Sequence, residues 1–268
     1  MLTQLLRLID VFLGDARRPL IVLLGPTASG KTSLSIEIAK HVDGEIVNAD
    51  SRQLYKYLDI GTAKITEGEM HGIPHHLLSI KDPDEEITVG KYQEWAFSAI
   101  EEVLSRTKVP ILIGGSMLYI ASITDGYVME RRPNAEISTA SARQGTKNEQ
   151  KKCSYDLLII GISVPRDALR KRIERRVDEM MKQGWIDEVR SILARGYSPA
   201  DPGMESHGYR EICEYLEELE GGEVGEEIEE AKERLKQRIV TKTCQYAKRQ
   251  LTWWRKDGRI HWIHTSDS

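Results

Sequence analysis

Cysteine, long apolar runs and excess positive charge are all scarce in this sequence, and each scarcity narrows the possibilities. The three cysteines, Cys153, Cys213 and Cys244, form no CxxC pair, which argues against a zinc site and a disulfide framework and fits a reducing cytoplasm. No apolar run reaches the roughly 18–20 residues that span a bilayer, so we expect no membrane partner. The net charge of −4 over 268 residues means that nucleic-acid binding would depend on clustered cations.

The first 18 residues carry spaced leucines and isoleucines, but Asp10 interrupts any signal-like apolar core and no small-residue cleavage site follows. We expect a short amphipathic helix packed on the domain, with a membrane-surface helix as the alternative.

Short apolar runs alternate with helical patterns along the chain. Residues 19–24 are wholly apolar, which suits a strand buried on both faces of a parallel sheet, and similar runs cover 45–49, 109–113 and 157–162. Thr88 is placed as the N-cap of the helix that follows it, and 259–264 as a short terminal strand. This alternation predicts an α/β fold, a P-loop doubly wound parallel sheet flanked by helices, with a helical C-terminal part.

The stretch 128–152 changes character, being rich in polar and charged residues with few large apolar ones. We interpret it as a polar linker. It separates the first part of the P-loop core, 1–127, from residues 153–268, which hold the last core strand and the C-terminal helical part.

A phosphate-binding loop follows the first predicted strand and precedes a predicted helix. It matches G-x-x-x-x-G-K-[ST] in full, as Gly25, Pro26, Thr27, Ala28, Ser29, Gly30, Lys31 and Thr32. Backbone amides of such a loop point at an anion, Lys31 adds positive charge, and the Thr32 hydroxyl can hold Mg²⁺. The motif indicates a di- or triphosphate, but not which one, nor whether a phosphate is transferred or leaves.

Asp50 lies at the carboxyl end of the second predicted strand, the edge where open α/β sheets bind ligands. A carboxylate there can hold a metal, orient an acceptor or accept a proton. The structural alternative is an N-cap for a turn that begins at Ser51.

Six further segments occur in order after the phosphate loop: D-S-R-Q-L-Y at 50–55, D-I-G-T-A-K at 59–64, P-H-H-L at 74–77, G-G-S-M-L-Y at 114–119, G-Y-R-E at 208–211 and A-K-R-Q-L-T-W at 247–253. With them the sequence resembles the tRNA dimethylallyltransferase (isopentenyltransferase) family over most of its length. The resemblance is far more specific than the phosphate loop alone.

The resemblance implies that the loop holds dimethylallyl diphosphate and that an adenine amine beside the tRNA anticodon attacks its allylic carbon. Asp50 matches the family's proposed base, since removing the amine proton keeps positive charge from building up. Lys31, Mg²⁺ on Thr32 and the loop amides would stabilise the leaving diphosphate. We expect a monomer.

The resemblance also supplies further site residues. Ser116 would contact phosphate or cap a helix, and Arg172 and Arg176 would reach the diphosphate or lie solvated on the surface. The residues expected to bind tRNA are Ser51, Arg52, Gln53, Gly208, Tyr209, Arg210, Lys242, Lys248, Arg249, Gln250, Thr252 and Trp253. Among residues 232–256 nine are Lys or Arg against one acid, which favours phosphate binding over an ordinary solvated helix. Tyr55 and Trp253 are candidate stacking surfaces for a flipped adenine.

The sequence departs from the family in one large respect: nothing matches its usual helical insertion, and only 128–152 stands in that place. Adenylate isopentenyltransferases, which act on free adenine nucleotides, also lack it and are the first alternative. A P-loop small-molecule kinase and a degenerate RNA-binding protein are further alternatives. His75 and His76 are assigned to a structural loop near the site, not to a metal.

Overall fold

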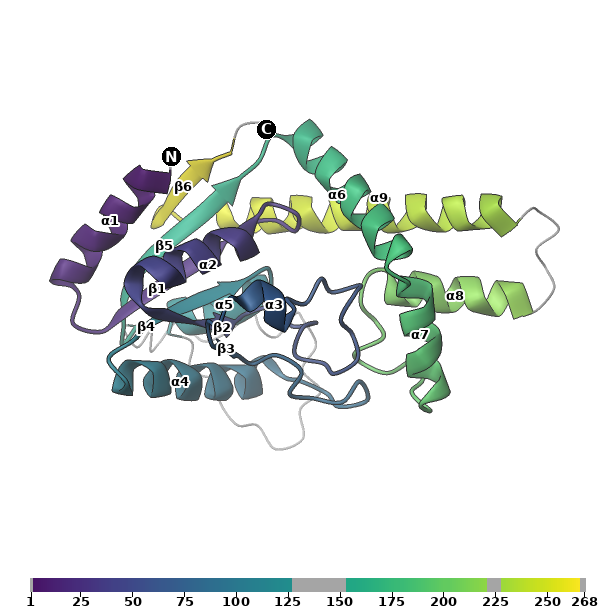
Figure 1. Cartoon of the computed structure of the whole chain (residues 1–268), viewed down its shortest axis with the longest axis horizontal. Helices are drawn as coiled ribbons and strands as arrows, with labels where there is room; N and C mark the ends of the chain where they lie inside the picture. The colour runs from purple at the N-terminus through teal and green to yellow at the C-terminus, as the bar shows by residue number, and fades with distance from the viewer. Residues whose placement is uncertain (1, 127–152, 221–227, 266–268) are drawn as a thin grey trace.

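The computed structural model describes residues 2–126, 153–220 and 228–265. Within them a six-stranded parallel sheet has the order β3-β2-β4-β1-β5-β6 (Figure 1). The strands are β1 (Pro19–Leu24), β2 (Gly44–Asn48), β3 (His75–His76), β4 (Val109–Gly114), β5 (Asp156–Ser163) and β6 (Ile260–His264). The predicted α/β doubly wound sheet, including the short terminal strand, is confirmed; the interval 128–152 lies outside the described residues.

Helices cover both faces of this sheet and continue beyond it. They are α1 (Leu2–Asp15), α2 (Lys31–Val42), α3 (Glu67–Met70), α4 (Val89–Ser105), α5 (Met117–Thr124), α6 (Arg166–Lys182), α7 (Trp185–Ala194), α8 (Tyr209–Glu220) and α9 (Ile228–Trp254). Ile21 and Leu23 of β1 belong to the core that α1 and α2 cover, while Leu20 and its alternate neighbours meet α4 and α5. Thr88 caps α4, as predicted, by accepting the Lys91 N–H.

The amino-terminal helix α1 packs on the domain through its buried residues Leu5 and Ile9. His41 Nε2 of α2 lies 2.7 Å from Asp10 Oδ1 of α1, and this contact joins the two helices. Among the described residues, no helix is long and apolar enough to cross a bilayer.

The histidine pair corrects one sequence interpretation. His75 and His76 form the edge strand β3, parallel to β2, instead of lying in a loop. His76 Nε2 lies 2.7 Å from the buried carboxylate of Glu45, which also accepts the Arg106 guanidinium. This contact fastens the edge of the sheet to the end of α4.

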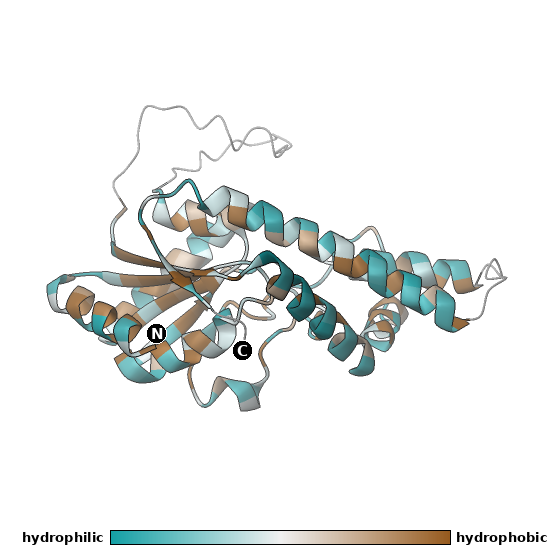
Figure 2. Ribbon diagram, turned by 90° about the horizontal axis from the view of Figure 1, so that it is seen from above, coloured by the Kyte–Doolittle hydropathy of each residue, from teal (hydrophilic) through white to brown (hydrophobic). Residues whose placement is uncertain are grey.

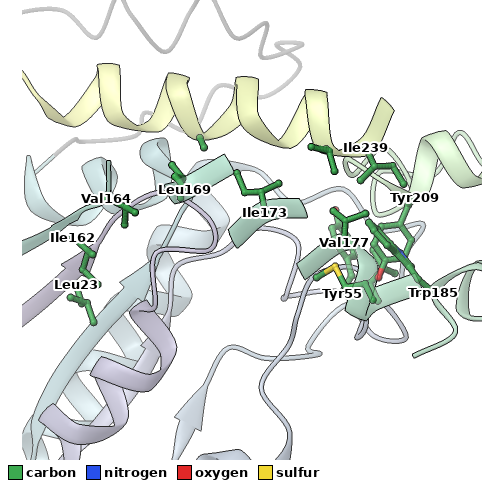
Figure 3. Close-up of a cluster of buried hydrophobic side chains, with 14 of the residues drawn as sticks. Leu23, Tyr55, Ile162, Val164, Leu169, Ile173, Val177, Trp185, Tyr209 and Ile239 are labelled. Carbon is green, nitrogen blue, oxygen red and sulfur yellow. The ribbon is translucent and has the colours of Figure 1, made fainter. Parts of the chain in front are cut away.

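The C-terminal helices share one core with the sheet. Figure 3 shows it running from Leu23 and Ile162 of the sheet, through Ile173 and Val177 of α6, to Trp185 at the start of α7. Figure 2 shows hydrophobic residues interspersed with strongly hydrophilic ones along the long helix α9. The helical part therefore holds a fixed position against the carboxyl ends of the strands.

Candidate active site

A crevice opens where β1 and β4 end side by side. The connection from β1 leads through α2 to β2 on one side, whereas that from β4 leads through α5 to β5 on the other. Loops that diverge in this way leave a ligand site at the carboxyl edge of a parallel sheet. Here the crevice is a cavity of about 360 Å³, roofed by α6 and α9.

The phosphate loop lines one end of the cavity with Thr27, Lys31 and Thr32. Gly30 has φ +91°, a left-handed conformation that suits glycine, and α2 begins at the next residue. The Lys31 ammonium donates to the Gly25 and Pro26 carbonyls, at 2.9 Å each. Burial, with the nearby Arg176 charge, lowers the Lys31 pKa to about 8 against an opposing effect of Asp50. This desolvated ammonium is suited to meet an anion in the cavity.

Of the two arginines predicted to reach the diphosphate, Arg172 and Arg176, only one lines the cavity. Arg176 lines the cavity, and burial lowers the pKa of its guanidinium. Arg172, one helical turn earlier on α6, is half-buried and is not among the lining residues. The phosphate end of the cavity therefore holds two described cations, Lys31 and Arg176, with Asp50 as their nearby counter-charge.

Asp50 is held in a fixed orientation at the end of β2. Its Oδ1 accepts the Arg52 N–H at 3.0 Å, so the turn contact expected of the structural alternative is present. The buried side chain of Asn48 holds the Asp50 backbone, donating to its carbonyl and accepting its N–H. Oδ2 takes no hydrogen bond among the described residues and lies on the Gly115 side, as a free acceptor beside the cavity.

The two glycines after β4 are required by close approaches. A Cβ on Gly114 would lie 2.1 Å from the Ala49 carbonyl oxygen, and one on Gly115 would lie 2.6 Å from Gln250 Nε2. Ser116 follows at the N-cap position of α5 but makes no side-chain cap. Its hydroxyl instead accepts the Ser51 N–H at 2.8 Å, so it joins the loop after β4 to the Asp50 turn.

Gln250 and Tyr246 of α9 close the cavity from above. Gln250 is buried; its amide oxygen accepts the Thr27 N–H at 3.1 Å and its amide nitrogen donates to the Gly115 carbonyl at 2.8 Å. Tyr246 donates its hydroxyl to the same carbonyl at 3.1 Å. The structure therefore places Gln250, which was expected to contact tRNA, in an enclosed position where its side chain links two loops of the site.

A wall of the cavity is held from outside by Glu188 of α7, which sequence reasoning missed. Its carboxylate accepts the N–H groups of Asp59, Ile60 and Gly61 at 3.0, 2.7 and 3.3 Å. Further along the same segment, the Thr62 and Ala63 carbonyls accept the Gln53 amide at 3.1 and 3.3 Å. The segment 59–64 thus connects α7 to Gln53, which lines the cavity.

Gly208 and Tyr209 support this wall from within the core and are not exposed for RNA contact. Tyr209 is fully buried, donates to Glu188 at 2.5 Å, and lies edge-on to Trp185. Gly208 packs so closely on Trp185 that a Cβ would lie 2.0 Å from its ring. Tyr55 is likewise buried, with its hydroxyl on the Glu85 carbonyl, and cannot stack on a base.

The basic face of α9 is partly neutralised by α8. Lys242 pairs with the buried carboxylate of Glu211, and Arg238 pairs with Glu214. Although burial opposes it, the Lys242 ammonium and the Gly208 N–H lower the Glu211 pKa. Lys242, which was expected to bind tRNA, is therefore already paired with an acid of α8.

Exposed groups remain toward the end of α9. Lys248 and Arg249 have no acidic partner among the described residues, and Thr252 and Trp253 are exposed beside them. Exposed Arg210, on α8, pairs with Glu214.

Comparison with known proteins finds relatives of one enzyme family. A model of the IPP transferase family matches residues 53–152 and 134–257. The tRNA dimethylallyltransferase of Macrococcus caseolyticus (strain JCSC5402) is 37% identical over 296 residues, covering 93% of this chain and 91% of the relative. That of Desulforudis audaxviator (strain MP104C) is 35% identical over 297 residues, covering 93% of each. Both alignments exceed the 268 residues of this chain, so these relatives contain residues without a counterpart here.

Solved structures agree with these matches. The tRNA isopentenylpyrophosphate transferase from Bacillus halodurans has a TM-score of 0.77 at 32% identity, covering 92% of this chain and 90% of that chain. A eukaryotic dimethylallyltransferase acting on tRNA has a TM-score of 0.78 at 25% identity, covering 93% of this chain and 74% of that chain.

Proposed function

The chain belongs to the IPP transferase family, and on that premise we propose that it transfers a dimethylallyl group from dimethylallyl diphosphate to the exocyclic amine of an adenosine beside the anticodon of a tRNA. The observation that carries this proposal is that one cavity is lined both by the phosphate loop and by Asp50, whose Oδ2 takes no hydrogen bond among the described residues.

At the donor end, Lys31, Arg176 and the loop amides would hold the diphosphate. Within the described residues no group of three or more His, Cys, Asp or Glu is placed to bind a metal. The Thr32 hydroxyl, next to Lys31 in the phosphate loop, is the group of this chain that would hold a magnesium ion. That ion would supply positive charge against the leaving group.

At the acceptor end, the adenine amine would enter from the side of Asp50 opposite the phosphate loop. An adenine amine is a weak nucleophile, and Oδ2 of Asp50 would take its proton as the new C–N bond forms. The Arg52 N–H keeps Oδ1 occupied, so the carboxylate presents one defined oxygen to the amine. Diphosphate leaves as the allylic C–O bond breaks.

The acceptor strand would follow the exposed end of α9, where Lys248 and Arg249 are free of acidic partners among the described residues. RNA binding through such contacts weakens as salt rises, by about −0.7 in log–log slope per phosphate neutralised on a single strand.

Incubation with labelled dimethylallyl diphosphate and either bulk tRNA or AMP tests the proposal. We expect label in tRNA, and a loss of roughly 10²–10⁴-fold in turnover for Asp50→Ala with donor binding retained. Efficient labelling of AMP without a tRNA product would instead indicate an adenylate isopentenyltransferase. Near-normal turnover in Asp50→Ala would remove Asp50 from the role of base.

A further inference from the structure

The cavity of the reaction site has an apolar arm along helix α6. This helix lines the cavity with Ile173, Arg176, Val177 and Met180, whose three- and four-residue spacing places them on one helix face. Arg176 lies at the phosphate end, where its charge acts on Lys31. Val177 and Met180 continue this face toward α7, and both are buried members of the core. The arm therefore runs from the diphosphate site to the end of α6.

Trp185, the first residue of α7, lines the cavity beyond Met180 and is held in place by its neighbours. A Cβ on Gly61 would lie 2.0 Å from Trp185 Nε1, and one on Gly208 would lie 2.0 Å from another atom of the ring. The ring of Tyr209 lies edge-on to it, with 5.7 Å between the ring centroids. Because backbone and ring contact the indole from these directions, it cannot move aside for a longer ligand.

Apolar side chains from other elements also line the cavity. They include Ile46 of β2, Ile65 after the segment 59–64, and Leu78 after β3. An alkenyl chain gains affinity from such walls in proportion to the apolar surface that it buries. How long a chain the cavity accepts therefore depends on where the arm ends.

The length of the arm fits one isoprene unit. Met180 follows Arg176 by four residues, which is about 6 Å along the axis of an α-helix. A dimethylallyl group reaches about 4 Å from its allylic carbon to its last methyl carbon, because three successive bonds of about 1.5 Å join them. A second isoprene unit would add about 5 Å, and its end would meet Met180 and Trp185.

We infer that Met180 sets the length of the prenyl donor, because it closes the arm after one isoprene unit with Trp185 behind it. The inference rests on the proposed function, since it requires a prenyl diphosphate at the phosphate loop. Of the two residues, Trp185 is fixed by its glycine and tyrosine neighbours. Met180 has an unbranched, flexible side chain, so its truncation to alanine lengthens the arm while α6 keeps a strong helix former.

The test is calorimetric titration with three ligands: inorganic diphosphate, dimethylallyl diphosphate and geranyl diphosphate, which carries one more isoprene unit. Met180→Ala opens the arm, whereas Met180→Leu nearly conserves its volume. Met181→Ala is the matched control, because Met181 is the same residue type at the next position, packs against the same core and does not line the cavity.

The wild type should bind geranyl diphosphate roughly a hundredfold more weakly than dimethylallyl diphosphate, since a hydrophobic pocket discriminates one methylene by about 10–200-fold. That ratio should fall to roughly tenfold or less in Met180→Ala and stay unchanged in Met180→Leu and Met181→Ala. Equal binding of inorganic diphosphate by all four proteins shows that each variant is folded. Val177→Ala removes two carbons from the same arm and should shift the ratio in the same direction, so it replaces Met180→Ala if that variant does not fold.

Equal affinity of the wild type for the two prenyl diphosphates would show that the arm is open at its end, and would overturn the inference. The same ratio in the wild type, Met180→Ala and Val177→Ala would overturn it as well. Neither result depends on turnover or on an RNA acceptor. If no prenyl diphosphate bound more tightly than inorganic diphosphate, the donor of the proposed function would be wrong and this inference with it, a result distinct from equal binding of the two prenyl chains.

Discussion

Replacing Glu188 by alanine tests whether the segment 59–64 is held from outside the cavity. The change removes the acceptor of three backbone N–H groups and of the Tyr209 hydroxyl. A hydrogen bond to a charged group contributes about 1.5–3 kcal/mol, and an unpaired buried donor costs about 1–3 kcal/mol. Because Glu188 is half-buried, water can replace part of this, and we expect a net loss of about 2–4 kcal/mol in unfolding free energy.

Urea denaturation measures this loss as a lower midpoint with an unchanged slope. The control is the neighbouring residue, Asp187→Ala, whose side chain is 76% exposed and makes one helical ion pair with Arg190. Such a pair contributes at most about 1 kcal/mol. Equal, small losses of unfolding free energy in Glu188→Ala and Asp187→Ala would show that Glu188 does not hold the segment 59–64.

The same variant has a functional consequence at temperatures where it stays folded. Gln53 is anchored by the carbonyls of Thr62 and Ala63, so a loosened segment releases a side chain of the acceptor end. We expect KM for RNA to rise while the dissociation constant of the prenyl diphosphate stays near that of the wild type. A change confined to donor affinity would contradict this.

Two further predictions concern charge and packing. Since the Lys31 pKa is about 8, its ammonium is lost above that pH, so donor affinity should fall about fivefold between pH 8 and pH 9, measured by calorimetry. Lys31→Arg stays charged and should remove that pH dependence. Gly208→Ala combines φ +93° with a Cβ 2.0 Å from the Trp185 ring, and should lower the unfolding free energy by about 2–5 kcal/mol. Gly14→Ala, in open space within a helix, should raise it by about 0.4–1 kcal/mol; a similar change in both would contradict the packing argument.

Local patterns in the sequence predicted the parts of the fold that depend on local physics. The buried strands read as apolar runs, the phosphate loop has a fixed spacing, and Thr88 is a cap whose partner lies three residues away. The two-residue strand β3 was missed because it has no periodicity of its own, and its place depends on pairing with β2.

The site was predicted where a motif names the residue and missed where the role depends on packing. Asp50 and Lys31 line one cavity as expected. Glu188 carries no local signal, since the backbone N–H groups that it accepts lie more than a hundred residues away. Lys242 looked free because the acid that pairs with it, Glu211, reaches it only when α8 docks on α9.

The contacts of the Gln250 side chain have a consequence for how the binding of the two substrates is coupled. Its amide joins the phosphate loop to the loop after β4, and it belongs to the same rigid helix as Arg249. A strand that shifts α9 on docking would therefore also shift Thr27 of the phosphate loop, whose N–H donates to Gln250. By thermodynamic reciprocity, the factor by which RNA changes donor affinity equals the factor by which donor changes RNA affinity. Through Gln250, the binding of one substrate can therefore change the affinity for the other before either reacts.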